Sequence, residues 1–303
     1  MACFVSLLTD QEAEVRAAAV AHLARMVTWG GSTNFTSHLQ PLLPALADDI
    51  VMEVRSKCAL ALMDSADGGT LEDNLILQAF GPLLENFLQD EFHEVQLQVL
   101  TNLHKIAHLL PGLAGVVTSL LQMSKAANWR VREAVAKLLP HLAEARGLDF
   151  FATVLLEPVW MVLLLDPVAS VRSAIVHGMG LLVKVVGDEW VMSQLLPQHV
   201  HLFNQDSSSY LVRMTIIQTH VEAAVVCKSG PLWNDFVVQI LVGLNDKVAN
   251  VRMVAAHGLA RVVSEGDPAM VQSQIRPALE KRMQDDDDHD CRQACELALA
   301  QVK

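Results

Sequence analysis

A Val-Arg dipeptide that returns about every 40 residues constrains this chain more than any other feature. Its second position recurs at steps of 39, 41, 36, 40, 41, 39 and 40 residues. Six copies are intact and two are degenerate, Val95-Gln96 and Cys291-Arg292. A period of this length is typical of stacked structural repeats, in which each repeat buries its apolar face only against its neighbours. The sequence therefore predicts one repeat array over residues 1–303.

Other residue types keep the same register within the repeat. An Asp usually stands six residues before the Arg position, an apolar residue seven after it, and a Pro some 14 to 16 before it. Apolar residues spaced three, four and seven apart lie on one face of an α-helix. Acidic or capping residues often precede the Val, which favours a helix start there. Each repeat is thus predicted to be a helix A, a turn with the Asp, and a helix B that opens at Val-Arg. The Pro is predicted to kink helix A or to start its second segment.

The predicted fold class is an all-α superhelical solenoid of eight helix pairs. The first pair is truncated, because its helix A has room only for Ala2 to Thr9. The approximate repeats span residues 1–30, 31–70, 71–110, 111–147, 148–187, 188–228, 229–266 and 267–303.

The recurring Asp and Arg would form a ladder along such an array, with each Asp bonded to the Arg of its own or of the next repeat. Ion pairs near a surface contribute only about 0.2–1 kcal/mol each, so the expected role of the ladder is to fix the register between repeats. A structural role is favoured over partner binding for these residues. The ladder consists of Asp10, Arg16, Asp49, Arg55, Asp166, Arg172, Arg213, Asp246, Arg252, Asp286 and Arg292.

Three repeats depart from the pattern. The third has Gln96 in place of the Arg, and the fourth has Ala126 in place of the Asp. In the sixth the Asp slips by one place to Asp206, and His220 interrupts the apolar series. His199, on helix A of the same repeat, is expected to be solvated or partly buried.

The composition excludes several partners. Net charge is −12 with a pI of about 5.4, and no Lys/Arg cluster is visible, so nucleic acid and anionic membranes are not expected partners. No run of about 18 uncharged apolar residues is found, so no membrane span is predicted. Five scattered cysteines favour a reducing compartment. The expected location is the cytoplasm, with the nucleus or the cytoskeleton as alternatives.

Residues suited to catalysis are scarce. His289 with Cys291 and Cys295 comes nearest to a metal cluster, but a zinc site needs four ligands. Both cysteines fall at small-residue positions of the repeat, which favours core packing. The sequence has no glycine-rich phosphate loop and no nucleophile elbow. We therefore expect no catalytic residue, no metal and no cofactor, and a protein that is not an enzyme.

Six stretches of sequence carry a family resemblance. They are NWRVREA (128–134), LDFF (148–151), GDEW (187–190), YLVRM (210–214), DKVANVR (246–252) and IRPALEK (275–281). In this order they resemble the C-terminal half of the HEAT-repeat scaffolding A subunits of protein phosphatase 2A. The resemblance covers nearly the whole chain and is strongest from about Asn128 onward.

The resemblance implies a partner and a binding edge. In that family the N-terminal repeats hold a regulatory subunit, and the last five grip the catalytic subunit through the turns between helices A and B. By resemblance, the fourth to eighth repeats here would face a phosphatase catalytic subunit, and the N-terminal end could hold a regulatory subunit or another assembly protein. The matching turn residues are Trp129, Arg130, Val168, Ser170, Tyr210, Leu211, Lys247 and Val248.

Two alternatives stay open. Trp129 could simply pack between repeats instead of meeting a partner. The chain could also be a structural or adaptor component of another large assembly, with no phosphatase bound.

Overall fold

The repeating apolar spacing folds into paired helices, stacked repeat upon repeat. The computed structural model describes residues 1–264 and 266–302, and that part of the chain contains helices and turns but no strand. The chain divides into two compact units, Met1–Val159 and Trp160–Lys303. The all-α fold class predicted from the sequence is confirmed.

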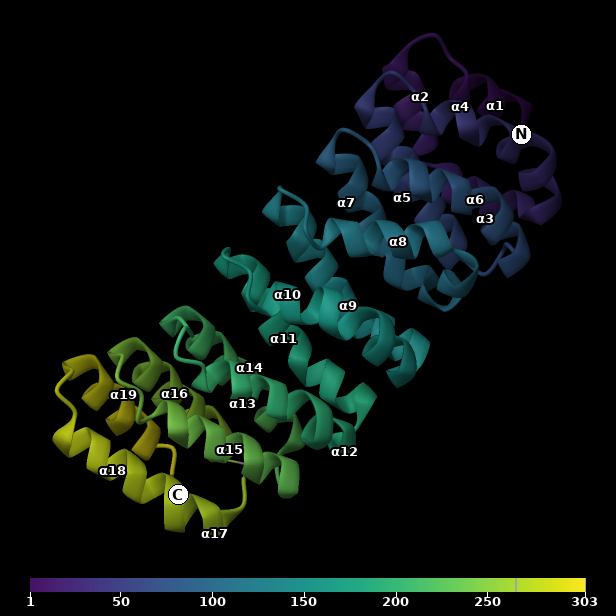
Figure 1. The fold of residues 1–303 in the computed structure, drawn as a ribbon. Coiled ribbons are helices and arrows are strands. Elements are labelled where there is room, and N and C mark those ends of the chain that lie inside the picture. Colours follow the sequence, from purple (N-terminus) through teal and green to yellow (C-terminus); the bar gives the residue numbers. More distant parts are fainter. Residues whose placement is uncertain (265, 303) are drawn as a thin grey trace. The chain divides into compact units, whose positions relative to one another are not determined.

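The first unit contains repeats 1 to 4. Its B helices follow one another in a layer, with α2 packed on α5, α5 on α7 and α7 on α9 (Figure 1). Helix A of each repeat is formed by α1 (Ala2–Leu8), η1 (Phe35–Leu39) with η2 (Gln40–Leu42) and α4 (Leu43–Ala47), α6 (Asp73–Leu88) and α8 (Ala114–Met123). Helix B is formed by α2 (Ala13–Val20) with α3 (Leu23–Asn34), α5 (Met52–Asp67), α7 (His93–Asn102) with η3 (Leu103–Gly112), and α9 (Trp129–Phe150).

The second unit contains the later repeats in the same arrangement, with α11 packed on α14, α14 on α16 and α16 on α19 (Figure 1). The segment η4 (Phe151–Trp160) contains the boundary between the units. Helix A segments are α10 (Met161–Leu164), α12 (Asp188–Trp190), η5 (Val191–Leu195), α13 (Leu196–Asn204), α15 (Pro231–Gly243), α17 (Pro268–Met270), η6 (Val271–Ile275) and α18 (Arg276–Asp285). B helices are α11 (Ala169–Val186), α14 (Tyr210–Cys227), α16 (Ala249–Val262) and α19 (His289–Leu299).

Each helix B begins two residues before its Val position, slightly earlier than the sequence predicted. In the repeats that retain it, the ladder Asp supports this start. The Asp49 carboxylate accepts a hydrogen bond from the backbone N–H of Val51 at 2.9 Å, and Val51 is the N-cap of α5. Because the side chain satisfies a backbone donor at the turn, the chain can enter the helix directly after it.

The ladder pairs the Arg of one repeat with the Asp of the next. Arg16 donates from Nε and Nη2 to the two carboxylate oxygens of Asp49, at 2.6 and 3.0 Å. Its Nη1 donates to the backbone oxygen of Asp10, in its own turn, at 2.7 Å. One guanidinium therefore joins the turn of its own repeat to the turn of the repeat that follows.

The same bidentate geometry recurs in both units. The pairs are Arg16–Asp49, Arg55–Asp90, Arg213–Asp246 and Arg252–Asp286. Burial alone would raise the pKa of Asp49, but the hydrogen bonds from Arg16 and from the Val51 N–H hold that pKa below its ordinary value. The side chains of these pairs are largely shielded from solvent. Bidentate, charge-assisted bonds between such side chains are stronger than ordinary surface ion pairs.

Two rungs of the ladder depart from the bidentate pattern. Gln96 and Ala126 replace the two partners of one rung, between repeats 3 and 4, so the Arg and the Asp are missing together. Gln96 keeps the contact with its own turn through a hydrogen bond to the Asp90 carbonyl at 2.7 Å. Helix B of repeat 3 is also irregular, because η3 contains a non-helical residue at Ile106. In the second unit, Arg172 donates instead to the Thr215 hydroxyl at 3.1 Å.

The recurring Pro reshapes helix A in several repeats. In repeats 2, 6 and 8 a π-helical turn ends two residues before the Pro, which then lies at the start of the next segment. Pro lacks an N–H and its ring crowds the carbonyl four residues earlier, so a wider turn relieves the clash. Pro82 differs, because it lies inside the continuous helix α6.

Two buried histidines occupy the core of repeat 6. His199 is fully buried, not solvated or partly buried as the sequence suggested, because the segment after Pro197 turns it inward towards α14. Its ring stacks on that of His220 with centroids 5.5 Å apart, and Phe236 lies 5.2 Å from His220. None of the four ring nitrogens has a hydrogen-bond partner among the described residues. Burial lowers the pKa of His199 to about 4 and holds the pKa of His220 well below its ordinary value.

Two helical stretches, Trp129–Leu164 and Ala169–Val186, are long and apolar enough to cross a membrane. The sequence prediction of no span rested on the absence of an uncharged run, and these stretches contain eight and two charged residues. This finding rests on helix length and composition alone, and the buried core helices of repeat proteins can have the same length and composition.

Rebuilding the missing rung should stabilise the first unit. We expect Gln96→Arg and Ala126→Asp together to raise the free energy of unfolding by about 1–2 kcal/mol beyond the sum of the single variants, because only the pair creates a charge-assisted bond. Urea denaturation of the parent, both single variants and the double variant measures this coupling. Strictly additive effects would show that the two positions do not meet.

The histidine pair should make the second unit sensitive to acid. Above about pH 6.5 both rings are neutral in the folded and unfolded chain. Below that pH the unfolded chain binds protons that the buried rings exclude, so stability falls towards pH 4, by up to about 1.4 kcal/mol per pH unit for each histidine. Urea denaturation at pH 7 and pH 5 measures this loss in the free energy of unfolding. The loss should be smaller for His220→Leu, which restores the apolar series, than for the parent. For His201→Leu, at an exposed position of α13, the loss should equal that of the parent.

Candidate functional site

The turns between helices A and B form the candidate binding edge. In the first unit, Trp129 is the first residue of α9, and Asn128 caps this helix by accepting from the Arg130 N–H at 2.9 Å. Trp129 is half-buried and Arg130 is exposed, with its guanidinium 4.6 Å from the centre of the indole ring. This cation–π contact holds a flat aromatic surface and a positive charge together at the turn.

In the second unit, Tyr210 and Leu211 form the most exposed apolar turn. They are 43% and 38% exposed and open helix α14. Ser209 fixes the start of the helix, because its hydroxyl accepts from the Val212 N–H at 3.3 Å. The aromatic ring and the leucine are therefore presented to solvent by a capped, ordered helix end.

The remaining predicted residues lie on the neighbouring turns of the second unit. The Val168 and Val248 N–H groups each donate to a ladder carboxylate at 2.8 Å, and both side chains are half-buried. Ser170 and Lys247 are exposed beside them. These turns belong to consecutive stacked repeats, so the three predicted pairs of this unit lie along one edge.

Exposed apolar residues also lie on turns for which the sequence predicted no partner. In the first unit Ile50 is 92% exposed and Phe92 is 41% exposed, with Val51 beside Ile50. The Arg55 guanidinium, held in the ladder, lies 5.5 Å from the centre of the Phe92 ring. Their position one or two residues after the ladder Asp could have revealed them, because Lys247 and Val248 have the same register.

A second set of ion pairs joins neighbouring B helices. Lys105 donates to Asp64 at 2.6 Å in the first unit, and Arg261 donates to Glu222 at 2.7 Å in the second. All four residues stand nine places after the ladder position of their repeat. This series was not predicted from the sequence, although its fixed offset and its pairs of opposite charges are visible there.

The cysteines near the C-terminal end are packed thiols. Cys291 and Cys295 are buried, and burial raises the pKa of each to about 11. The Cys291 thiol donates to the Ala249 carbonyl at 3.1 Å, whereas the neighbouring His289 is exposed. Within residues 1–264 and 266–302, no group of three or more His, Cys, Asp or Glu side chains is placed to hold a metal ion.

No protein-family model and no curated protein matches the chain. Solved structures are similar. One is the structure in which Kap95p binding induces the switch loops of RanGDP to adopt the GTP-bound conformation. A chain of that structure is 15% identical to this chain, with a TM-score of 0.58, and the match covers 98% of this chain and 40% of that one. Kap121p is 13% identical, with a TM-score of 0.72, and the match covers 98% of this chain and 33% of that one. A multiply substituted Kap121p is 13% identical, with a TM-score of 0.71, and the match covers 99% of this chain and 33% of that one.

These similarities establish the fold. Because the identity is low, they show the fold alone, and that fold is a HEAT-repeat helical solenoid. The chain spans about a third to two fifths of the length of the structures that it matches.

Thiol labelling should separate the cysteines by burial. We expect iodoacetamide to modify the exposed Cys3 rapidly at pH 7.5 and to leave Cys58, Cys291 and Cys295 unmodified in the folded chain, because the thiolate is the reactive form. Burial raises the pKa of Cys58 to about 12. Peptide mass spectrometry with and without urea provides the measurement. Fast labelling of Cys291 in the native chain would contradict this packing.

Proposed function

We propose that the chain is a non-catalytic scaffold that binds the catalytic subunit of a serine/threonine protein phosphatase through the turns of its last five repeats. The observation that carries the proposal is the ordered presentation of Trp129, Arg130, Tyr210 and Leu211 at capped helix ends. The sequence stretches that resemble the phosphatase 2A scaffolding subunits contain these residues. Trp, Tyr and Arg are also the side chains that most often dominate binding energy at protein interfaces.

The ladder supports this role physically. In the second unit, the bidentate pairs Arg213–Asp246 and Arg252–Asp286 tie the turns of repeats 6, 7 and 8 together, so the binding residues on these turns are held in place before a partner arrives. Pre-organised side chains lose little entropy on binding. The expected partner is a folded protein and the expected location is the cytoplasm.

A second candidate is an adaptor in another large assembly, with no phosphatase bound. The exposed Ile50 and Phe92 favour it, because they extend the apolar turn edge beyond the last five repeats. Kap95p and Kap121p share the fold, and the Kap95p structure reports binding to RanGDP. In the first candidate a regulatory subunit would bind near the N-terminal repeats, and in the second another assembly protein would bind there.

Removing the Trp129 and Arg130 side chains should weaken phosphatase binding. We expect the double variant Trp129→Ala, Arg130→Ala to bind purified phosphatase 2A catalytic subunit at least about 30-fold more weakly, since interface anchors contribute 2 kcal/mol or more. Biolayer interferometry with the immobilised chain measures the dissociation constant.

The matched control is Val238→Ala with Leu297→Ala. These side chains of α15 and α19 are 41% and 54% exposed and lie within helices, away from the turns between helices A and B, so binding should be unchanged. Equal binding by the Trp129 and Arg130 variant would remove the proposed site. A parent chain that binds no catalytic subunit would leave the second candidate.

A further inference from the structure

An apolar hollow of about 580 Å³ lies on the first repeat, beside α1 and α2 near the N-terminus (Figure 1). Its walls are mostly apolar and include Phe4 and Leu7 of α1, Val15 and Ala18 of α2, and Met26 of α3. Leu7 is 40% exposed, and Ala18 is exposed as well. The first repeat thus leaves open an apolar surface of the kind that stacked repeats bury against a neighbour.

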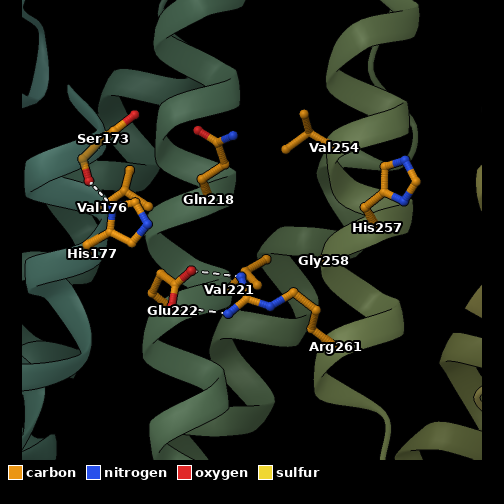
Figure 2. Close-up of a pocket in the computed structure, with 10 residues that line it drawn as sticks. All are labelled: Ser173, Val176, His177, Gln218, Val221, Glu222, Val254, His257, Gly258 and Arg261. Carbon is orange, nitrogen blue, oxygen red and sulfur yellow. Dashed lines mark hydrogen bonds and ion pairs between the residues drawn. The ribbon is translucent and has the colours of Figure 1, made fainter. Parts of the chain in front are cut away.

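Contacts between consecutive repeats of the second unit show what such a surface receives. Ile217 of α14 packs on Gly243 of α15, and Val221 of α14 packs on Gly258 of α16. Figure 2 shows Val221 and Gly258 on these two B helices, beside a cavity of about 340 Å³ that α11, α14 and α16 line and that Arg261 borders. Helix B of one repeat therefore packs on both helices of the repeat that follows.

The first repeat has the same receiving positions, and they are exposed. Gly243 stands nine residues before the ladder Arg of its repeat and Gly258 six after it, and their equivalents in the first repeat are Leu7 and His22. Both glycines are buried, whereas Leu7 and His22 are exposed. Trp29, on α3 beyond His22, is 74% exposed. Large exposed side chains at positions that elsewhere receive a neighbour indicate a stacking surface.

Asp10 is one half of a ladder rung. Its carboxylate accepts from the Glu12 N–H at 2.9 Å, as the Asp49 carboxylate accepts from the Val51 N–H. Asp49 also receives two hydrogen bonds from Arg16 of the preceding repeat, whereas the Asp10 carboxylate receives none from an Arg among the described residues. The turn therefore holds the Asp10 carboxylate as it holds that of Asp49, with acceptor sites left for a guanidinium.

The charges at this turn favour a cation. Glu12 is exposed two residues after Asp10, and the exposed Glu14 lines the hollow. Arg16 is the cation nearest to them in sequence, and it is already held by its own turn and by the next repeat. Arg25 lies farther along helix B, on α3. The three carboxylates therefore leave a net negative charge at the turn, which a guanidinium complements.

A second copy of this chain fits the face poorly. Arg292 of the eighth repeat bonds to its own turn and has no carboxylate partner among the described residues. Four residues after the ladder position, however, repeats 1 to 7 carry a buried apolar residue, such as Ile217 on Gly243, whereas the eighth carries the exposed Glu296. Stacking the eighth repeat on the first would set this carboxylate against Leu7. This argues for a helix pair of a different protein.

We infer that the N-terminal face of the first unit binds a helical repeat of another protein. Helix B of that repeat begins with an Arg, which completes a bidentate rung with Asp10. Four positions later it carries a small or apolar residue, which packs on Leu7, and its other apolar side chains fill the hollow. This face belongs to the first repeat, whereas the phosphatase proposal concerns the turns of the last five, so neither depends on the other.

A helical peptide with the sequence of α5 tests the inference, because α5 carries Arg55 and, four residues later, Ala59. A hydrocarbon staple on the opposite face keeps the peptide helical, and Cys58→Ala removes its thiol. Fluorescence anisotropy of the labelled peptide with the full chain should show saturable binding. Asp10→Arg in the chain should weaken binding about 10-fold or more, because a charge-assisted pair becomes a repulsion. The same variant should bind an Arg55→Asp peptide more tightly than the parent chain does.

Two further variants of the full chain control the measurement. Leu7→Ala, at an exposed position in the hollow, should also weaken binding and guards against a folding defect in the Asp10 variant. The matched control is Asp67→Arg, which reverses an exposed carboxylate at the end of α5 in the first unit and should leave binding unchanged.

The inference is overturned if the parent fails to bind the α5 peptide at about 1 mM, or if Asp67→Arg reduces binding as much as Asp10→Arg. It is also overturned if Asp10→Arg shows no preference for the Arg55→Asp peptide, or if Leu7→Ala binds like the parent. Sedimentation velocity completes the test. Self-association of the parent that Asp10→Arg abolishes would assign the face to a second copy of the chain and overturn the inference.

Discussion

The bidentate bond between the Arg of one repeat and the Asp of the next is the interaction on which the rest of the structure depends. The same carboxylate also holds the amide that precedes helix B, and the same guanidinium holds the carbonyl of its own turn. A single pair thus sets where a helix starts, how a turn is shaped and how two repeats align. Apolar packing provides the stability, but it is tolerant of small slips that the ladder prevents.

This alignment places equivalent residues in rows on two faces of the array. Along the turns, residues just after each ladder Asp or at the helix start are presented side by side. Along the B helices, residues nine places after the ladder position meet their counterparts in the next repeat, as Lys105 and Asp64 do in the first unit and Arg261 and Glu222 in the second. Equivalent positions therefore form rows along the array, and each row is one surface built from several repeats.

Periodicity alone was enough to predict the helix pairs and the turns, because these depend on spacing within one repeat. It left open whether each Asp bonds its own Arg or that of a neighbouring repeat, since that depends on how far adjacent layers are offset. The burial of His199 was missed for a similar reason, because the widened turn before Pro197 rotates the following segment. The cavity beside Arg261 could not be foreseen either, because it depends on the gap between three separate helices.

The missing rung between Gln96 and Ala126 has a mechanical consequence. Stacked repeats act like springs in series, and the softest joint takes up most of any bend applied to the stack. In the first unit the joints between repeats 1 and 2 and between repeats 2 and 3 are clamped by ion pairs, whereas the next joint has Gln96 and Ala126 in place of the Arg–Asp pair and includes the irregular segment around Ile106. A partner that pulls on this unit would therefore bend it there first, and the turns on either side would keep their own geometry while the distance between them changed.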